Sequence, residues 1–443
     1  MSRELKDSGV EWIGKIPANW SVEKIKYTTY VKGRIGWQGL KSDEFTDEGP
    51  YLVTGKDFIG KNVNWESCHH ISRERYHEAP PIQLKENDLL ITKDGTIGKT
   101  AIVRDMPDKA ILNSGIFVTR SAKYEVDFMY WMLNSQVFDK YIKFFETGST
   151  IKHLYQETFE NFSYPLPTRL EQKKISLFLN RKIKLVDEVI KNKGNMMTLL
   201  EKQCQSIITE AVTKGLNPNV KMKDSGVEWI GEIPEHWEVS KFKYLGKLVN
   251  GYPFPSNEFS SSGVRVMKIN NIQNMRLDWN DESFIDESYF IKLKEFRIQK
   301  NDLVFALTRP IISTGIKAAI VDIDEPILLN QRNAYFRSGK KICSSWLYYL
   351  MLNKNFVQEF ESLIDRTGQQ PNISSIDIEN IKLPIPPVLE QEVIINHLNH
   401  EGFKVEKTVT NLKNQIKKLK EYRQSLIYEA VTGKIDVRDM ELY

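Results

Sequence analysis

The sequence is poor in the features that mark secreted and membrane-spanning proteins. It has only three cysteines, Cys68, Cys204 and Cys343, in 443 residues, a pattern that argues against a disulfide framework and favours a reducing compartment. No apolar run approaches the roughly 18 residues of a membrane-spanning helix. The first residues lack the charged-then-apolar pattern of a secretion signal. We therefore expect a cytoplasmic protein that does not bind a membrane.

Motifs for catalysis and for cofactor or metal binding are also missing. The segment Gly95–Thr100 is similar to a phosphate-binding loop, but Lys93 stands where that loop needs its first glycine, so a turn between strands is expected. The group Cys68–His70 with His77 has no second close cysteine pair, which favours a surface loop over a metal site. Asn217–Val220 departs at two positions from the Asn-Pro-Pro-Tyr motif of adenine methyltransferases. No Gly-x-Ser-x-Gly motif or nuclease carboxylate cluster is present. We expect no catalysis, no cofactor and no metal.

The overall composition is that of a folded protein with a mild positive charge. Hydrophobic residues make up 41% of the chain, which is enough to form buried cores. The net charge is +4 and the isoelectric point is about 8.6. These values permit nucleic-acid binding without demanding it, since dedicated DNA-binding domains often exceed an isoelectric point of about 9.

The chain is a tandem duplication. Matching residues of the first pair below are 217 positions apart, and those of the other two pairs are 219 positions apart. A period near half the chain length indicates two copies of one unit, not a solenoid of short repeats. The matching pairs are Leu5–Trp20 with Met222–Trp237, Leu170–Gln172 with Leu389–Gln391, and Glu210–Thr213 with Glu429–Thr432.

Each copy ends in a segment that predicts one helix of roughly 45 residues. Apolar residues recur at spacings of four and three, which is the seam of a coiled coil. Every seam position in the second copy lies 219 residues after one in the first, so we expect the two seams to pack against each other as an antiparallel pair; an intermolecular dimer is the alternative. The first seam is Val186, Ile190, Met197, Leu200, Cys204, Ile207 and Ala211, with Lys193 filling the gap; the second is Val405, Val409, Leu412, Ile416, Leu419, Arg423, Leu426 and Ala430.

The remainder of each copy predicts a small mixed domain. Short β-branched or aromatic runs separated by turns predict strands, and each domain continues into a helix, Asp127–Phe138 or Ser344–Phe356, and a proline-bracketed strand. The expected fold is α+β, with two similar mixed α/β domains separated by two long helices that form an antiparallel coiled coil with pseudo-twofold symmetry. The predicted strands are 50–54, 88–92, 99–103 and 116–119 in the first copy and 264–269, 302–306, 317–321 and 334–336 in the second. The predicted boundaries are 1–166 and 218–385 for the domains, 167–217 for the first spacer helix and 386–443 for the second helix and tail.

The two domains keep one scaffold but differ in the segments between its elements. Gly33–Gly39 faces Val249–Pro255 in the second copy, and Lys93–Lys99 faces Leu307–Gly315. This contrast predicts two binding modules with one frame and two different binding surfaces.

Taken together, the layout resembles the specificity subunit of a type I restriction-modification system. The resemblance covers almost the whole chain and rests on the motifs named at the end of this paragraph. It implies two target-recognition domains that each read half of a split site in double-stranded DNA. It also implies spacer helices that dock two modification (methyltransferase) subunits, restriction (helicase-nuclease) subunits that join the complex, and no enzyme activity in this subunit. The motifs are Gly9–Gly14 and Gly226–Gly231, the repeated Leu-Glu-Gln and Glu-Ala-Val-Thr segments, Asn87-Asp88 and Asn301-Asp302, and Gly368–Ser374, from which the first copy departs at Gly148–His153.

Candidate DNA contacts follow from the chemistry of base and phosphate recognition. Arginine and lysine suit guanine, asparagine and glutamine suit adenine, and lysine, arginine, serine and threonine suit phosphates. Each candidate has the alternative of being a solvated loop residue. At the level of the whole chain, the rival functions are a coiled-coil scaffold whose twin domains bind protein partners and a stand-alone enzyme. The candidates are Lys56, Lys93, Thr96, Lys99 and Asn113 in the first domain and Lys268, Asn270, Asn271, Arg309, Gln331 and Arg332 in the second.

Overall fold

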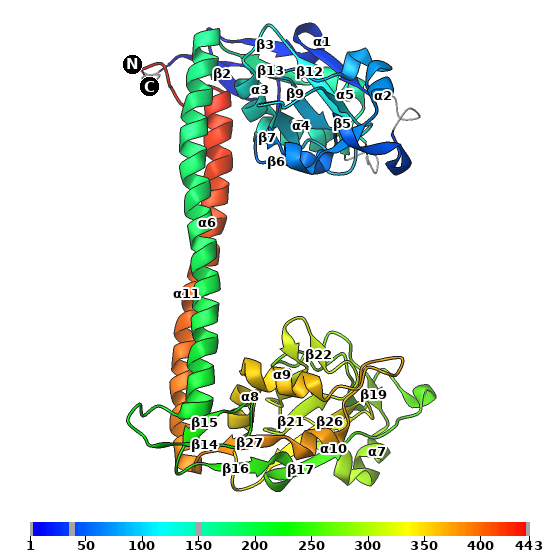
Figure 1. Cartoon of the computed structure of the whole chain (residues 1–443), viewed down its shortest axis with the longest axis vertical. Coiled ribbons are helices and arrows are strands. Elements are labelled where there is room, and N and C mark those ends of the chain that lie inside the picture. Colours follow the sequence, from blue (N-terminus) through cyan, green and yellow to red (C-terminus); the bar gives the residue numbers. More distant parts are fainter. Residues whose placement is uncertain (1–2, 35–39, 147–152, 440–443) are drawn as a thin grey trace. The chain divides into compact units, whose positions relative to one another are not determined.

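The structure is a computed structural model of the chain and describes residues 3–34, 40–146 and 153–439. Most of Gly33–Gly39 and of Gly148–His153 therefore lies outside the described residues. Internal contacts divide the chain into two units, one formed by Met1–Lys193 with Lys413–Tyr443 and the other by Gly194–Leu412. Each unit contains one α+β domain and a part of both long helices (Figure 1). No helix in the described part of the chain is long and apolar enough to cross a membrane.

The domain of the first unit consists of short strands and helices. The strands are β1 (Leu5–Asp7), β2 (Lys15–Pro17), β3 (Ser21–Lys24), β4 (Tyr30–Gly33), β5 (Phe45–Val53), β6 (Phe58–Ile59), β7 (Asn62–Val63), β8 (His69–Ile71), β9 (Leu89–Thr92), β10 (Thr100–Ile102), β11 (Ala110–Leu112), β12 (Ile116–Arg120) and β13 (Ser163–Leu166). The helices are α1 (Ile25–Thr28), α2 (Arg73–His77), α3 (Val126–Leu133), α4 (Gln136–Glu146) and α5 (Gln156–Glu160).

The domain of the second unit repeats most of these elements. The strands are β14 (Met222–Asp224), β15 (Glu232–Pro234), β16 (Glu238–Lys241), β17 (Gly246–Asn250), β18 (Val264–Met267), β19 (Phe284–Ile285), β20 (Arg297–Ile298), β21 (Leu303–Ala306), β22 (Ile311–Ile312), β23 (Gly315–Ile316), β24 (Ala318–Ile320), β25 (Ile327–Leu329), β26 (Asn333–Ser338) and β27 (Lys382–Ile385). The helices are α7 (Glu287–Lys292), α8 (Ser344–Leu352), α9 (Lys354–Ser362) and α10 (Ser375–Asn380).

The same sheet core recurs in both domains. The first has the strand order β4-β12-β9-β10-β7-β6 and the second has β17-β26-β21-β24. A smaller sheet in each domain contains one parallel pair, β11 with β5 and β25 with β18. All eight predicted strand segments lie in these sheets, which confirms the α+β prediction; β11 and β25 were not predicted.

An ion pair between a buried carboxylate and a partly exposed arginine holds the central sheet of each domain. Arg120 Nε and Nη2 donate to the two carboxylate oxygens of Asp88, each at 2.7 Å. In the second domain Arg337 donates to Asp302 in the same forked manner, at 2.9 and 2.6 Å. Both carboxylates are buried, so the repeated Asn-Asp motif is explained as part of the scaffold.

The repeated tryptophan and Leu-Glu-Gln motifs bind each other. The indole of Trp20 donates to Glu171 at 3.2 Å, and that of Trp237 donates to Glu390 at 3.1 Å. The neighbouring amide of Gln172 accepts from the backbone N–H of Glu125 at 2.7 Å, next to the start of α3. These residues fix the start of each long helix on its domain, and the most recognisable motifs of the sequence are therefore structural.

The predicted long helices are confirmed as α6 (Arg169–Lys214) and α11 (Val388–Val431). Within each unit the two lie side by side (Figure 1). In the first unit Arg423 Nε donates to Asp187 at 2.9 Å and Lys193 Nζ donates to Gln415 at 2.6 Å. Since the residue number rises in α6 as it falls in α11, the helices run antiparallel. All predicted seam positions are buried or half-buried, whereas many neighbouring positions are exposed.

Both long helices end at a glycine that packs against a tryptophan repeat. Gly215 and Gly433 have φ angles of +74° and +72°, the left-handed conformation that commonly terminates helices. A Cβ on Gly433 would lie 2.5 Å from Pro17 and 2.8 Å from Trp20. The end of α11 therefore packs on the first domain, as the end of α6 packs on Trp237 of the second.

The predictions of single helices at 127–138 and 344–356 were wrong. Each segment is two helices, α3 and α4 in the first domain and α8 and α9 in the second, with breaks at Asn134–Ser135 and at Asn353. The buried amide of Asn353 accepts from the N–H groups of Asn355 and Phe356, which starts a new helix there. The repeated Leu-Asn motif therefore marks a helix break.

Candidate nucleic-acid interface

In each domain four loop segments meet at one edge of the sheets, held by matching backbone hydrogen bonds. In the first domain Lys93 N–H donates to Gly115 O at 2.9 Å, Asn113 N–H to Val53 O at 3.0 Å, and Leu154 N–H to Lys93 O at 2.7 Å. These bonds join the segments that follow β5, β9 and β11 to the segment that precedes α5.

The second domain repeats every one of these bonds. Leu307 N–H donates to Arg332 O at 2.9 Å, Asn330 N–H to Met267 O at 3.0 Å, and Ile373 N–H to Leu307 O at 2.9 Å. The two edges can therefore be superposed residue by residue from their bonding. We refer to them as the first and second loop edges.

A buried or half-buried lysine braces each edge. Lys99 Nζ donates to Gly55 O at 3.1 Å, and Lys317 Nζ donates to Ile269 O at 2.7 Å, at corresponding places. Burial lowers the pKa of Lys317, and the nearby positive charge of Arg309 lowers it further. Lys317 was not among the sequence-based candidates, although Lys99 was. The signal was available, because the matching predicted strands 99–103 and 317–321 both begin with a lysine.

The first loop edge carries a pocket of about 610 Å³. Asp94 on its wall is bonded to His153 and, at 3.1 Å, to Lys93 Nζ. Burial by itself would raise the pKa of Asp94, but the hydrogen bonds and charges of these two partners outweigh it and the pKa is lowered. The wall is thus both cationic and anionic, which suits the mixed donors and acceptors of base edges. The pocket is lined by Phe45, Thr54, Gly55, Lys56, His69, Thr92, Asp94, Gly95, Thr96 and Lys99.

Only some of the candidate contacts of the first domain line the pocket of this edge. Lys56, Thr96 and Lys99 line the pocket, and Lys56 and Thr96 are exposed. Asn113 is half-buried and its Oδ1 accepts from Ser114 N–H at 2.8 Å. Lys93 is only 7% exposed and its ammonium is held by Asp94, so it lies behind this surface.

The candidate contacts of the second domain divide in the same way. Arg309, Gln331 and Arg332 are exposed on the second loop edge. Asn271 is 1% exposed and all its side-chain bonds go to the backbone, at Lys268, Asp278 and Asp281.

Lys268 and Asn270 occupy the loop that follows β18. Lys268 is half-buried, and its ammonium lies 3.8 Å from a carboxylate oxygen of Asp281. Asn270 is exposed and donates to the same carboxylate at 3.3 Å.

The two motifs that suggested cofactor or metal binding have structural explanations. Gly95–Thr100 contains the turn between the antiparallel strands β9 and β10. His70 Nδ1 donates to Gly49 O at 2.7 Å, and His69 stacks on Phe45 with ring centroids 4.5 Å apart. Burial raises the pKa of Cys68 to about 12. Among the residues that the structure describes, no group of histidine, cysteine or carboxylate side chains could hold a metal ion.

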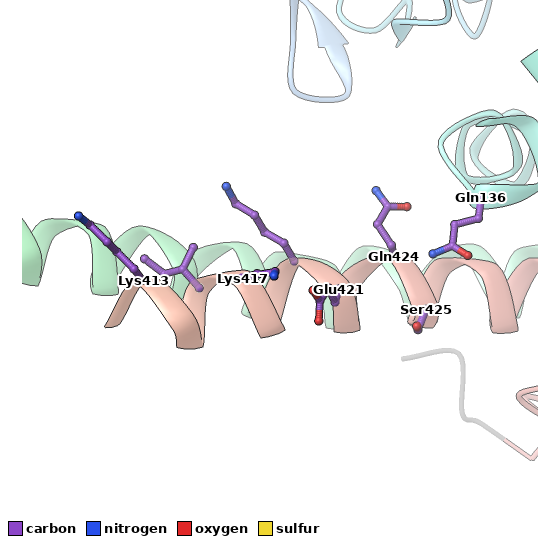
Figure 2. A pocket seen from close by; sticks show the side chains of 8 residues that line it. Gln136, Lys413, Lys417, Glu421, Gln424 and Ser425 are labelled. Atoms are coloured by element: carbon purple, nitrogen blue, oxygen red, sulfur yellow. The ribbon is translucent and has the colours of Figure 1, made fainter. Parts of the chain in front are cut away.

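The first unit also has a groove on α11, away from the loop edge. Its volume is about 530 Å³, and Figure 2 shows Gln136, at the start of α4, beside Gln424 of α11. Its lining includes three lysines and one apolar side chain, that of Ile416. The groove is lined by Gln136, Lys413, Ile416, Lys417, Lys420, Glu421, Gln424 and Ser425.

Two domains with one backbone frame, different loop side chains and a shared coiled coil define a duplicated recognition protein. The sequence pattern of the family described as "Type I restriction modification DNA specificity domain" matches residues 38–196 and 234–421. The chain belongs to this family, whose members are non-catalytic specificity subunits that provide DNA sequence recognition.

Individual relatives agree with this assignment. The chain is 30% identical over 436 residues to the type I restriction enzyme MjaVIII specificity subunit of Methanocaldococcus jannaschii, covering 96% of this chain and 95% of that protein. A subunit of a solved type I restriction-modification system has the same fold, with a TM-score of 0.74, 14% identity, and coverage of 95% of this chain and 99% of the other. The crystal structure of the HsdS subunit from Thermoanaerobacter tengcongensis matches with a TM-score of 0.55 and 16% identity, over 97% and 100% of the two chains.

Proposed function

We propose that this specificity subunit reads a bipartite and asymmetric site in double-stranded DNA, with residues 1–166 reading one half and residues 218–385 the other. The observation that carries the proposal is the pair of loop edges, which share their backbone bonds but not their side chains. A conserved frame with different surfaces suits two readers of different sequences, because base identity is read by side chains at base edges.

The proposal is tested by producing the chain with its modification subunits in a host that lacks other DNA methylation and sequencing the methylated genome. The expected result is one motif with two specified parts separated by unspecified bases. Methylation without any sequence preference would contradict DNA reading and leave the scaffold function as the explanation.

We further propose that α6 and α11 act as a spacer and dock two modification subunits, which restriction subunits then join in the cytoplasm. Beside its seam, α6 exposes a second set of apolar side chains, Leu185, Val189, Met196 and Leu199. Their spacings of four, seven and three place them on one helix face. The positions of α11 that lie 219 residues later, Lys404, Thr408, Gln415 and Lys418, are all polar.

An unpartnered apolar helix face of this kind fits an amphipathic helix of a partner subunit. The double substitution Leu185→Gln with Val189→Gln should lower co-purification of the modification subunit at least about tenfold, since two buried apolar side chains would be lost from the contact. The matched control is Lys184→Gln with Glu188→Gln. These two residues are exposed and immediately precede Leu185 and Val189. Undiminished co-purification of the first variant would place the partner elsewhere.

A further inference from the structure

We propose that the second domain specifies at least one guanine in its half-site, and that Arg309 or Arg332 reads it through a forked contact. This inference rests on the proposed function and adds the identity of the base. It starts from a comparison of the two loop edges at positions that their hydrogen bonds make equivalent.

Both arginines stand where the first domain has glycine. The bond from Leu307 N–H to Arg332 O corresponds to the bond from Lys93 N–H to Gly115 O, so Arg332 is equivalent to Gly115. The bridge of Thr308 with Asn372 corresponds to that of Asp94 with His153. Thr308 is therefore equivalent to Asp94, and Arg309, which follows Thr308, is equivalent to Gly95, which follows Asp94.

The backbone of Arg309 keeps the conformation of a glycine. Gly95 has a φ angle of +69° and Arg309 has one of +47°. Both lie in the left-handed region, which residues other than glycine rarely adopt. The loop holds it there, because Arg309 N–H donates to Pro371 O at 2.7 Å and Pro310 follows. Non-glycine residues in this region concentrate at functional sites, where the side chain has a use that outweighs the strain.

The two guanidinium groups are available for a ligand. Both side chains are exposed, and neither has a carboxylate or carbonyl partner among the described residues. Four other arginines of the same domain are each held by carboxylates or backbone carbonyls. These are Arg265, Arg297, Arg337 and Arg366.

The chemistry of this pair favours guanine over the other bases. In the major groove guanine presents two acceptors, O6 and N7, and the guanidinium fork can donate to both at once. The buried ammonium of Lys317, close enough to Arg309 for the charges to interact, adds to the positive potential of the edge. The first loop edge differs at this place, because it has glycines instead of the two arginines, and a carboxylate oxygen of Asp94 lies 3.9 Å from where a Cβ of Gly115 would be.

The test compares the methylation motif of the wild-type complex with that of complexes containing Arg309→Gly or Arg332→Gly. A bidentate contact discriminates between bases by roughly 5- to 150-fold. We expect at least one of these variants to lose its preference for one guanine of the second half-site by that factor, with the first half-site unchanged. Arg309→Lys should keep the positive charge and part of the preference, because an ammonium can still donate to guanine O6 and N7 but lacks the planar fork of the guanidinium.

Two controls distinguish a lost base contact from a loss of stability and from a general loss of positive charge. Arg309→Gly should leave the thermal midpoint unchanged or raise it, because glycine adopts a positive φ without strain. Arg276→Ala removes another exposed arginine that lies in a different loop, between β18 and β19. It should leave the base preference unchanged.

The inference is overturned if the second half-site contains no guanine, if both glycine variants keep the full preference, or if Arg276→Ala relaxes the same base. In each case the wild-type complex would still methylate a two-part motif, so the proposed function would stand. Loss of sequence preference in the wild-type complex would refute both.

Discussion

Asp88 and Asp302 are single carboxylates that tie together the strands of each central sheet. Each is buried and accepts two hydrogen bonds from an arginine of the next strand. Removing one partner of such a pair leaves a charge without its counterpart. The two arginines differ in how easily water can replace the lost partner, because Arg120 is 25% exposed and Arg337 is 37% exposed.

We therefore expect Asp88→Ala to lower the free energy of unfolding by about 3–4 kcal/mol and Asp302→Ala by about 2–3 kcal/mol. Calorimetric melting of each variant measures the effect. Lys221→Ala, which removes a fully surface-exposed ion pair with Glu235, is the control and should cost less than about 0.5 kcal/mol. An Asp88 variant as stable as this control would show that the fork does not hold the sheet.

At this scale the sequence predicted candidates in segments that meet at the two loop edges, but not which of these residues face outward. Lys56, Thr96, Arg309, Gln331 and Arg332 are exposed on the loop edges. Lys93 and Asn271 were also predicted as contacts in segments of these edges, but both are buried. Composition places a residue at a strand end, whereas its orientation depends on bonds to segments far away in the sequence.

The equivalence of Gly95 with Arg309 was hidden for a related reason. Matching residues of the two copies are 214 positions apart at Gly95 and Arg309, 218 apart at Lys99 and Lys317, and 217 apart at Gly115 and Arg332, because the loops differ in length. No single offset aligns the loop edges. Only the repeated backbone bonds do.

Among the elements, the ends of α6 and α11 offer a matched pair of glycines. Both have positive φ angles, but the space around them differs. A Cβ on Gly215 would meet Trp237 at 3.3 Å, whereas one on Gly433 would meet Pro17 at 2.5 Å.

Gly215→Ala should therefore cost about 1 kcal/mol from backbone strain alone. Gly433→Ala should cost about 2–4 kcal/mol, because overpacking adds to the strain. The midpoints of thermal unfolding of the two variants check this order. A larger loss for Gly215→Ala would mean that the end of α11 does not pack on the first domain.

The seam between the long helices contains a lysine whose replacement should be stabilising. Lys193 is half-buried among apolar seam residues and donates to Gln415 at 2.6 Å. A polar residue at such a position costs stability in exchange for register. Lys193→Leu should raise the free energy of unfolding by about 1 kcal/mol, while Lys191→Leu, at an exposed position, should not. Destabilisation by Lys193→Leu, measured by thermal melting, would argue against the seam.

Most of the elements could be predicted because their signals are local. The heptad spacing of α6 and α11 and the β-branched or aromatic runs of the sheet strands need no knowledge of distant contacts. The break between α8 and α9 could not be predicted, because it depends on the buried amide of Asn353, which bonds its own backbone. The pairing of β11 with β5 was also missed, since a parallel pair joins segments far apart in the sequence.

For the whole molecule, two readers on one frame should be exchangeable independently. Replacing residues 30–165 with those of another family member should change one half of the methylated motif and leave the other half intact. The segment excludes the Trp20–Glu171 bond and the end of α11, which attach the domain to the helices. Methylome sequencing of the hybrid complex measures the outcome. A change in both halves would refute the modular arrangement.

The way the first unit is put together has a consequence for how the protein is made. Its core combines Ile13, Ile16 and Trp20 with Leu426, Ile427 and Val431. Residues 194–412, by contrast, form the second unit from one continuous stretch. During synthesis the second unit can therefore complete its core while the first still waits with apolar surface uncovered. A ribosome that stops before residue 413 leaves a chain whose earliest-made domain is the unfinished one, and such chains should be bound by chaperones or degraded before they join a complex.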